Sequence, residues 1–306
     1  MTGQSILVIG GGFLGCALAH ALSAKNYRVT ILSPRTEPSK RQGQPAIVRG
    51  GQEDGRLVAE LLREHNTVIH TAWGTTPGSS AGQPTLETAA GLAPWVAFLD
   101  TLQQFPSVRL VFLSSGGTVY GGPEQLPVAE DYPLRPLSCH GAGKAAAELF
   151  LATLTPTRLA GSTVLRPSNV YGPEQPLRGG FGVLRHLLQC AINGRSFTLW
   201  GDGSQVRDYL YVDDFVDAVL RVLERPNVLG VYNIGSGTGA SLLELIALVE
   251  NVTARRIQVE SQPPRAGDVA QIVLDIGKFH GATGWMPTTS LSEGIARTWR
   301  WLRENA

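Results

Sequence analysis

A glycine pattern near the N-terminus constrains the fold of this chain more than any other feature. Gly10, Gly12 and Gly15 follow the apolar run Ile6–Ile9 and open a stretch with helical apolar spacing. Glycines at these positions allow a tight turn, close approach of a pyrophosphate and close packing of the helix. The N–H groups of the first helical turn then point at the phosphates. The residues expected to line this dinucleotide site are Gly10, Gly12, Phe13, Leu14 and Gly15.

Short apolar runs alternate with helical stretches through the first half of the chain. Such alternation predicts right-handed crossovers and a Rossmann-type doubly wound parallel sheet in an α/β fold. The predicted strands are Ile6–Ile9, Arg28–Leu32, Thr67–His70, Val108–Leu113 and Gly161–Leu165. The predicted helices are Phe13–Lys25, Leu57–Glu64, Pro94–Gln104 and Lys144–Leu154.

The rhythm changes after residue 168, where Gly and Pro become dense through Gly172–Gly182. The chain of 306 residues is long enough for one large α/β unit and a smaller C-terminal lobe. We predict a dinucleotide-binding domain of residues 1–168 plus 206–234, and a substrate-binding lobe of residues 169–205 plus 235–306.

Composition excludes several function classes. A net charge of +1 offers no basic surface for nucleic acid or an anionic membrane, and no apolar run reaches membrane-spanning length. The N-terminus lacks the pattern of a signal peptide. Cys16, Cys139 and Cys190 are scattered without disulfide or zinc spacing, so we expect packing cysteines, no metal and a reducing cytoplasm.

The end of the second predicted strand should select the cofactor ribose. NAD-binding proteins usually place an acidic residue there, whereas this chain has Ser33, Pro34 and Arg35. Arg35 could pair with a 2′-phosphate and Ser33 could hydrogen-bond to it. The cofactor is therefore expected to be NAD or NADP, with a slight tilt toward NADP.

Further motifs occur in order along nearly the whole chain, at His70–Ala72, Ser114–Gly121, Leu165–Pro173, Gly201–Tyr209 and Arg265–Asp268. Together they resemble the extended short-chain dehydrogenases of the NAD-dependent epimerase/dehydratase family, which act on nucleotide sugars. The resemblance implies cofactor contacts at Ala72, Lys144 and Pro167. It also implies a homodimer formed through the helices near Pro94–Gln104 and Lys144–Leu154.

The same resemblance implies how a nucleotide sugar would be held. Asn169, Arg207 and Arg265 match the residues that bind its diphosphate, and Asp268 matches a contact to its ribose. Arginine suits a diphosphate because its guanidinium binds anionic oxygens in pairs. An ion pair with Asp208 is the alternative for Arg207. Leu184, like Leu199 and Trp200, could border the nucleobase or simply pack in the lobe.

The chain departs from the family at the reaction centre. The family uses a tyrosine and a lysine four residues apart, together with a serine or threonine from an earlier strand end. Lys144 is present, but His140 stands at the tyrosine position and Gly116 at the hydroxyl position. The nearest hydroxyls are Thr118 and Ser115. Histidine can transfer protons near neutrality, since its unperturbed pKa is about 6.5.

The resulting expectation is an NAD(P)-dependent nucleotide-sugar 4-epimerase that oxidises its sugar transiently and returns the hydride. The dehydratase acids are absent, because Gly116, Gly117 and Thr118 occupy the positions of Thr-Asp-Glu. Two alternatives stay open. One is an NADPH-dependent reductase of 4-keto sugars, and the other is a catalytically altered or silent nucleotide-binding homologue.

Overall fold

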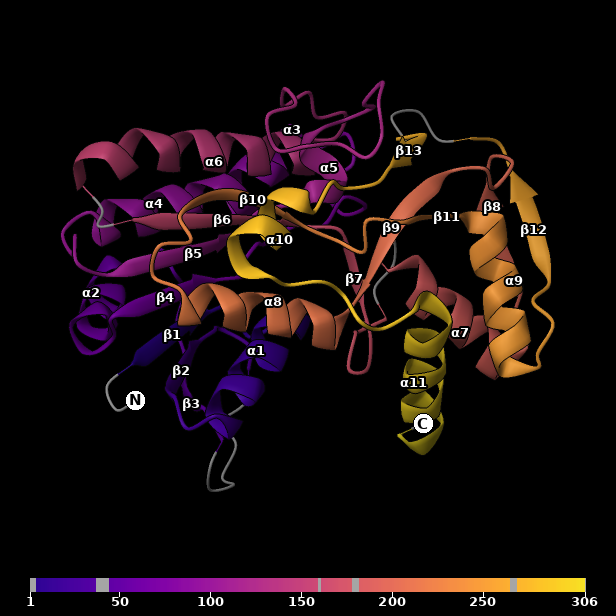
Figure 1. The fold of residues 1–306 in the computed structure, drawn as a ribbon, viewed down its shortest axis with the longest axis horizontal. Helices are drawn as coiled ribbons and strands as arrows, with labels where there is room; N and C mark the ends of the chain where they lie inside the picture. Colours follow the sequence, from indigo (N-terminus) through magenta and orange to yellow (C-terminus); the bar gives the residue numbers. More distant parts are fainter. Residues whose placement is uncertain (1–3, 37–43, 159–160, 178–181, 265–268, 306) are drawn as a thin grey trace.

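The computed structural model describes residues 4–36, 44–158, 161–177, 182–264 and 269–305, and Figure 1 shows how they are arranged. A large sheet with helices on both faces occupies one side of the view, and a smaller lobe holds the C-terminal helix at the other. No helix within the described ranges has both the length and the apolar character needed to cross a bilayer.

The large sheet has seven strands: β1 Ser5–Ile9, β2 Arg28–Leu32, β3 Ala46–Val48, β4 Thr67–His70, β5 Arg109–Leu113, β6 Ser162–Pro167 and β10 Gly230–Ile234. Their order is β10-β6-β5-β4-β1-β2-β3, and every neighbouring pair is parallel. The central strands are buried almost throughout, as in parallel sheets covered on both faces. The predicted doubly wound parallel sheet is confirmed.

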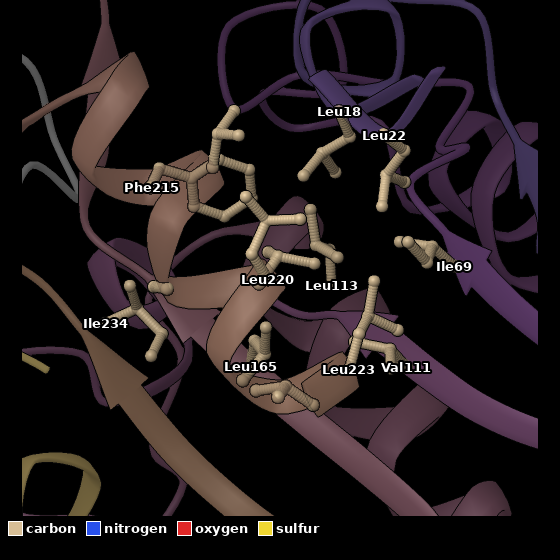
Figure 2. Close-up of a cluster of buried hydrophobic side chains, with 14 of the residues drawn as sticks. Leu18, Leu22, Ile69, Val111, Leu113, Leu165, Phe215, Leu220, Leu223 and Ile234 are labelled. Carbon is tan, nitrogen blue, oxygen red and sulfur yellow. The ribbon is translucent and has the colours of Figure 1, made fainter. Parts of the chain in front are cut away.

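Two groups of helices cover the faces of this sheet. The first group is α2 Gly55–Glu64, α4 Ala93–Leu102 and α6 Cys139–Arg158, and the second is α1 Phe13–Ala24 and α8 Val212–Glu224. Successive side chains of a strand point to opposite faces. Leu7 and Ile9 of β1 accordingly pack under the first group, whereas Ile6 and Val8 pack under the second. Figure 2 shows side chains of α1 and α8 gathered over β4, β5 and β6.

The smaller lobe is built from short strands and three helices. Its strands are β7 Asn169–Tyr171, β8 Phe197–Trp200, β9 Val206–Tyr211, β11 Gly239–Ser241, β12 Val259–Gln262 and β13 Gln271–Ile272. Its helices are α7 Val183–Asn193, α9 Leu242–Thr253 and α11 Leu291–Glu304. A separate apolar core joins these elements, with Leu187, Leu245 and Ile295 fully buried in it.

The return of the chain to the large sheet differs from the sequence-based expectation in one element. β9, the strand at Val206–Tyr211, pairs with β7, β11 and β13, so it belongs to the smaller sheet. The return begins with α8 and continues in β10. α8 was not predicted. Its buried stripe, which includes Phe215 and Val219, is what packs it against the large sheet.

Four short helical segments complete the fold: α3 Pro84–Glu87, the π-helical segment η1 Thr88–Leu92, α5 Gly116–Val119 and α10 Gly277–Thr283. None of these four segments was predicted from the sequence. α3 and η1 lead into α4 and contact α6. α5 follows β5 immediately and contacts both β6 and α6. α3, η1 and α5 therefore lie against α6, the helix of His140, whereas α10 packs against β10.

Candidate functional site

The carboxyl ends of the central strands meet along one edge of the large sheet. The strand register aligns Ile9 with His70, His70 with Phe112, and Leu113 with Leu165. The segments that follow these strands therefore start side by side, and ligands of open α/β sheets bind at this edge. The glycine loop, residues 71–75, α5 and residues 167–169 all begin here.

The glycine loop is shaped for a close-lying ligand. A Cβ at Gly15 would lie 1.8 Å from the Gly10 carbonyl oxygen, and one at Gly10 would lie 2.7 Å from the Ala72 nitrogen. Neither position has room for a side chain. A Cβ at Gly12 would meet nothing within 4 Å, so the space beside the N-cap of α1 is open. The first-turn N–H groups, including those of Phe13 and Leu14, have no side-chain cap, and this arrangement fits a dinucleotide pyrophosphate.

The two residues predicted to contact the cofactor ribose, Ser33 and Arg35, differ in burial. Ser33 is buried, and its hydroxyl accepts a hydrogen bond from Thr36 Oγ1 at 2.9 Å. Thr36 Oγ1 also lies 3.0 Å from the Gly11 carbonyl oxygen, which ties this turn to the glycine loop. Arg35 is exposed. The Ser33 hydroxyl is thus already bonded within the turn.

Lys144 lies deep in the site, on the second turn of α6. It is only 5% exposed, and its Nζ donates a hydrogen bond to the Leu113 carbonyl oxygen at 2.7 Å. The same Nζ lies 4.1 Å from the centre of the Trp73 ring and 5.0 Å from that of Phe112. Burial lowers the pKa of Lys144 to about 7, against the opposing pull of Glu87 and Glu148.

His140 lies one turn before Lys144 on the same face of α6, as the spacing of four residues requires. It is 8% exposed, and its Nδ1 lies 3.3 Å from Thr75 Oγ1 and 3.9 Å from Glu87 Oε1. Burial, and then the charge of Lys144, lower the pKa of His140 to about 4, although Glu87 opposes them. At neutral pH the imidazole is therefore uncharged and able to accept a proton.

Glu87 is a residue of this site that the sequence-based prediction missed. The side chain is 3% exposed and accepts hydrogen bonds from Trp73 Nε1 at 2.8 Å and Thr75 Oγ1 at 2.5 Å. Burial raises the pKa of Glu87, but hydrogen bonds from Ser80, Thr75 and Trp73 outweigh it and lower the pKa overall. The carboxylate is thus charged at neutrality. Nothing in the helical pattern around Glu87 distinguished it from a surface residue.

The two candidate hydroxyls occupy different places near α5. Ser115 is the N-cap residue of α5, and its carbonyl oxygen accepts from Thr118 N and Val119 N. Thr118 Oγ1 is buried without a hydrogen-bond partner among the described residues. The Thr118 carbonyl oxygen would lie 2.4 Å from a Cβ at Gly141, so Thr118 lies close to the first turn of α6. An unpartnered buried hydroxyl at this edge is free to bond a ligand.

Gly116 is a glycine for packing reasons. A Cβ there would lie 2.5 Å from Leu274 Cδ1 and 2.8 Å from the Arg166 carbonyl oxygen. A serine at this position would require the Leu274 side chain and the β6 backbone to move. The chain therefore has no space for the family's hydroxyl at this position.

Tyr120, the tyrosine that follows α5, is part of a structural network. Its OH donates to Asn233 Oδ1 at 2.6 Å and accepts from Arg166 Nη1 at 2.7 Å. Arg166 in turn pairs with Glu148 of α6 at 2.6 Å. Burial raises the pKa of Tyr120 to about 12. It is therefore no substitute for the missing tyrosine.

Two of the predicted diphosphate ligands are neighbours across β7 and β9. Asn169 is exposed, and its Nδ2 donates to the Asp208 carbonyl oxygen at 3.0 Å. A Cβ at Gly117 would lie 3.9 Å from Asn169 Oδ1, so this amide faces α5. Arg207 Nη1 donates to the Val206 carbonyl oxygen at 2.9 Å. Asn169 thus lies beside α5, and Arg207 lies on the neighbouring strand β9.

Asp208 and Leu184 are both buried but differ in their surroundings. Asp208, the alternative ion-pair partner of Arg207, is buried, and its carboxylate accepts from the backbone of Ser236 and Gly237 at 2.7 and 3.2 Å. Leu184 is 2% exposed in the core of the smaller lobe, which accounts for it by packing. Arg265 and Asp268 lie outside the described residues.

The three cysteines form no disulfide, and all lie in the described part of the chain. Burial raises the pKa of Cys16 and of Cys190, which makes these thiols poor nucleophiles. Among the described residues, no three His, Cys, Asp or Glu side chains gather as a metal site would require.

Comparisons with known proteins agree with this geometry. Residues 6–235 match the profile of the NAD dependent epimerase/dehydratase family. The chain is 30% identical to the UDP-glucose 4-epimerase of Mycolicibacterium smegmatis over 99% of each chain. The crystal structure of Thermus thermophilus UDP-glucose 4-epimerase in complex with NAD superimposes with a TM-score of 0.91, at 31% identity over 99% of this chain and 100% of that one. Thermotoga maritima UDP-glucose 4-epimerase with UDP-glucose also has a TM-score of 0.91, at 29% identity over 99% of both chains.

Proposed function

Because this chain belongs to the NAD-dependent epimerase/dehydratase family, we propose that it is a 4-epimerase of a nucleoside-diphosphate hexose that uses NAD. One observation carries the proposal. Residues 71–75 run from the glycine loop to His140, so the predicted dinucleotide site and the buried His140–Lys144 pair lie along one continuous segment. A UDP-hexose is the substrate class favoured by the relatives' UDP-glucose specificity.

The dinucleotide would lie over the open face of Gly12, with its pyrophosphate on the first turn of α1. When bound, it supplies hydride acceptance from the sugar carbon and hydride return. Ala72, Lys144 and Pro167 would border its nicotinamide end. NAD is the cofactor in the solved relative, and the tilt toward NADP has no support there. Ser33, whose hydroxyl would have to donate to a 2′-phosphate, is only 4% exposed.

At the reaction centre, His140 would exchange the proton of the sugar hydroxyl. Its pKa of about 4 leaves the imidazole neutral but weakly basic at pH 7, so it would accept the proton only as the departing hydride makes the sugar hydroxyl strongly acidic. Lys144 would contact the nicotinamide ribose and hold the imidazole environment positive. Thr118 is the hydroxyl best suited to bond the sugar, because its Oγ1 is buried and has no partner among the described residues. Ser115 is the second hydroxyl at the same edge.

The smaller lobe would hold the nucleoside diphosphate. Asn169, beside α5, and Arg207, on β9, would bind the diphosphate, and Arg265 and Asp268 would complete the site. Leu184 supports the lobe from its core. In this proposal residues 1–168 plus 212–234 bind the dinucleotide, and residues 169–205 plus 235–306 bind the sugar nucleotide together with β9, which belongs to the smaller sheet.

The assembly and compartment are proposals of the same kind. We infer a cytoplasmic homodimer joined through α4 and α6. The exposed Leu149 and Phe150 on α6 offer an apolar surface for such contact. The substrate is a small molecule, with no role for nucleic acid or membrane.

The decisive experiment incubates the purified protein with NAD and a UDP-hexose, without added reductant, and follows the two C4 epimers. The proposal predicts that either epimer is converted into the same equilibrium mixture. Consumption of NADPH with a 4-keto sugar would identify the reductase instead. Bound dinucleotide without any change in any UDP-hexose would identify a silent homologue.

A further inference from the structure

A buried carboxylate faces His140 from outside α6, and the proposed reaction does not yet use it. Glu87 Oε1 lies 3.9 Å from His140 Nδ1, with both side chains less than 10% exposed. Thr75 Oγ1 lies between them, 2.5 Å from Glu87 Oε2 and 3.3 Å from His140 Nδ1. Burying a charged carboxylate is costly unless its oxygens are bonded. This arrangement therefore calls for an explanation beyond packing.

The packing around Glu87 is specific to this carboxylate. A Cβ at Gly143, on α6, would lie 2.4 Å from Glu87 Oε1, and a Cβ at Gly91 would lie 3.0 Å from the same oxygen. Glycines on both sides thus leave the space that Glu87 fills. Trp73 then fixes the carboxylate by donating its ring N–H at 2.8 Å. A side chain at either glycine would therefore displace the Glu87 carboxylate from its place beside α6.

The hydrogen bonds determine where each proton lies. The Thr75 hydroxyl has one proton, and a charged carboxylate at 2.5 Å is a much stronger acceptor than an imidazole nitrogen at 3.3 Å. That proton therefore points to Glu87, and Thr75 Oγ1 offers a lone pair to His140 Nδ1. A neutral imidazole carries one N–H. Placing it on Nδ1 satisfies Thr75, whereas a lone pair there would be repelled by Glu87.

We propose that Glu87, acting through Thr75, holds the proton of neutral His140 on Nδ1 and leaves Nε2 as the base that accepts the sugar hydroxyl proton. This inference rests on the proposed epimerase function for its chemical step. Nε2 makes no hydrogen bond with any described residue, so it is the nitrogen available to a substrate. Glu87 and Thr75 are positioning residues, since they act through His140.

The proton step balances within these groups. As the hydride leaves the sugar carbon for the dinucleotide, the O–H bond of the hydroxyl breaks and an N–H bond forms at Nε2. His140 then carries a positive charge, which Glu87 stabilises and Lys144 opposes. These are the two charged groups that affect His140 among the described residues. The proton returns to the oxygen when the hydride is returned, which leaves His140 neutral again.

The test measures the tautomer directly by NMR on protein labelled with ¹⁵N in the histidine rings. The chain has six histidines, and His140→Gln assigns the His140 signals. Wild-type protein at neutral pH should show His140 protonated at Nδ1. Glu87→Gln and Thr75→Val should move population toward the Nε2–H tautomer, and Thr75→Ser should retain the wild-type form. Glu60→Gln, at an exposed glutamate of α2, is the matched control.

Turnover supplies the second readout. Glu87→Gln should lower kcat by about tenfold or more with little change in KM, because proton transfer is impaired while binding is kept. It should also shift the acidic limb of the kcat profile to lower pH. Thr75→Ser should restore most of the kcat that Thr75→Val loses. A purely structural role would not produce that rescue.

The outcomes separate this inference from the proposed function. An Nε2–H tautomer in the wild type, or an Nδ1–H tautomer unaffected by both Glu87→Gln and Thr75→Val, overturns the inference whatever the turnover. If either variant fails to fold, the other variant and the wild-type tautomer decide. An Nδ1–H tautomer that depends on Glu87 in a protein without epimerase activity supports the proton assignment and rejects the epimerase.

Discussion

Two helices begin at the same edge of the sheet and present different groups there. α1 begins at Gly12, beside open space, and offers backbone N–H groups without a side-chain cap. α6 begins at Cys139 and places His140 among Trp73, Thr75 and Glu87, all from other segments. The first site is made of backbone, and the second is made of side chains.

This difference explains why the glycine loop can be predicted from the sequence, whereas the surroundings of His140 cannot. A backbone site needs glycines at fixed spacing, because the chain must turn tightly and approach the ligand. A site made of side chains can transfer a proton with different residue types, provided that the surroundings shift the pKa of the residue that carries the proton. Here an imidazole stands where the family has a phenol, and a buried carboxylate faces it.

The largest effect is expected at the backbone site. Gly15→Val should lower dinucleotide affinity by about a hundredfold or more, since its Cβ would lie 1.8 Å from the Gly10 carbonyl oxygen and the turn must open. Calorimetric titration with NAD measures it. Gly281→Val, at an exposed helical glycine with nothing within 4 Å of its Cβ, is the control. Equal affinity in both variants would show that the loop does not hold the cofactor.

A smaller effect is expected where the sugar nucleotide is bound. Arg207→Ala should raise KM for the UDP-hexose by about tenfold or more through the loss of charge-assisted hydrogen bonds, with NAD affinity retained. The KM of Arg207→Lys should lie between those of the wild type and Arg207→Ala. Steady-state kinetics at fixed NAD checks this. Unchanged KM and unchanged binding of UDP would remove Arg207 from the diphosphate site.

The smallest effect concerns acid stability. The pKa of His140 falls from an ordinary 6.5 to about 4 on folding, so the unfolded chain binds the proton more readily. Its contribution to stability is therefore complete above pH 6.5 and is lost as the pH falls toward 4. Between pH 7 and pH 5 the loss should be about 2 kcal/mol. Lys144, with a pKa of about 7, titrates at the upper edge of this window, and comparison with a variant that keeps Lys144 separates its contribution from that of His140.

Urea unfolding at pH 7 and pH 5 measures that loss. His140→Gln should lose less stability than the wild type over this interval, by about 2 kcal/mol. His20→Gln, at an exposed histidine, should behave as the wild type. An equal pH dependence of the unfolding free energy in all three proteins would show that the His140 pKa is near its ordinary value and that burial does not lower it.

The sequence predicts the large sheet well because its strands are short, apolar and separated by amphipathic helices. It predicts less of the smaller lobe. β9 leaves the large sheet because β7 follows β6 after one residue and pairs with β9, and such pairing between distant strands has no local signal. α8 was missed although its apolar stripe is regular, because it begins at Val212 directly after β9 and has no side-chain cap to mark its start.

The same limit applies to the site. Gly10, Gly15, His140 and Lys144 were found because a local motif contains each of them. Glu87 and Thr75 reach His140 only through the fold, from 53 and 65 residues away in the sequence. Gly116 was identified as a departure from the family, but its cause, the contact with Leu274, is also long-range.

The substitution His140→Tyr tests the central claim most directly, namely that this pocket is built around histidine. We expect kcat for UDP-hexose epimerisation to fall, with the affinities for NAD and UDP unchanged as controls. A phenol beside Glu87 would be harder to ionise, and it is longer than the imidazole that it replaces. A kcat equal to or above the wild-type value would contradict the account, because it would show that His140 is only a weakened version of the family's tyrosine.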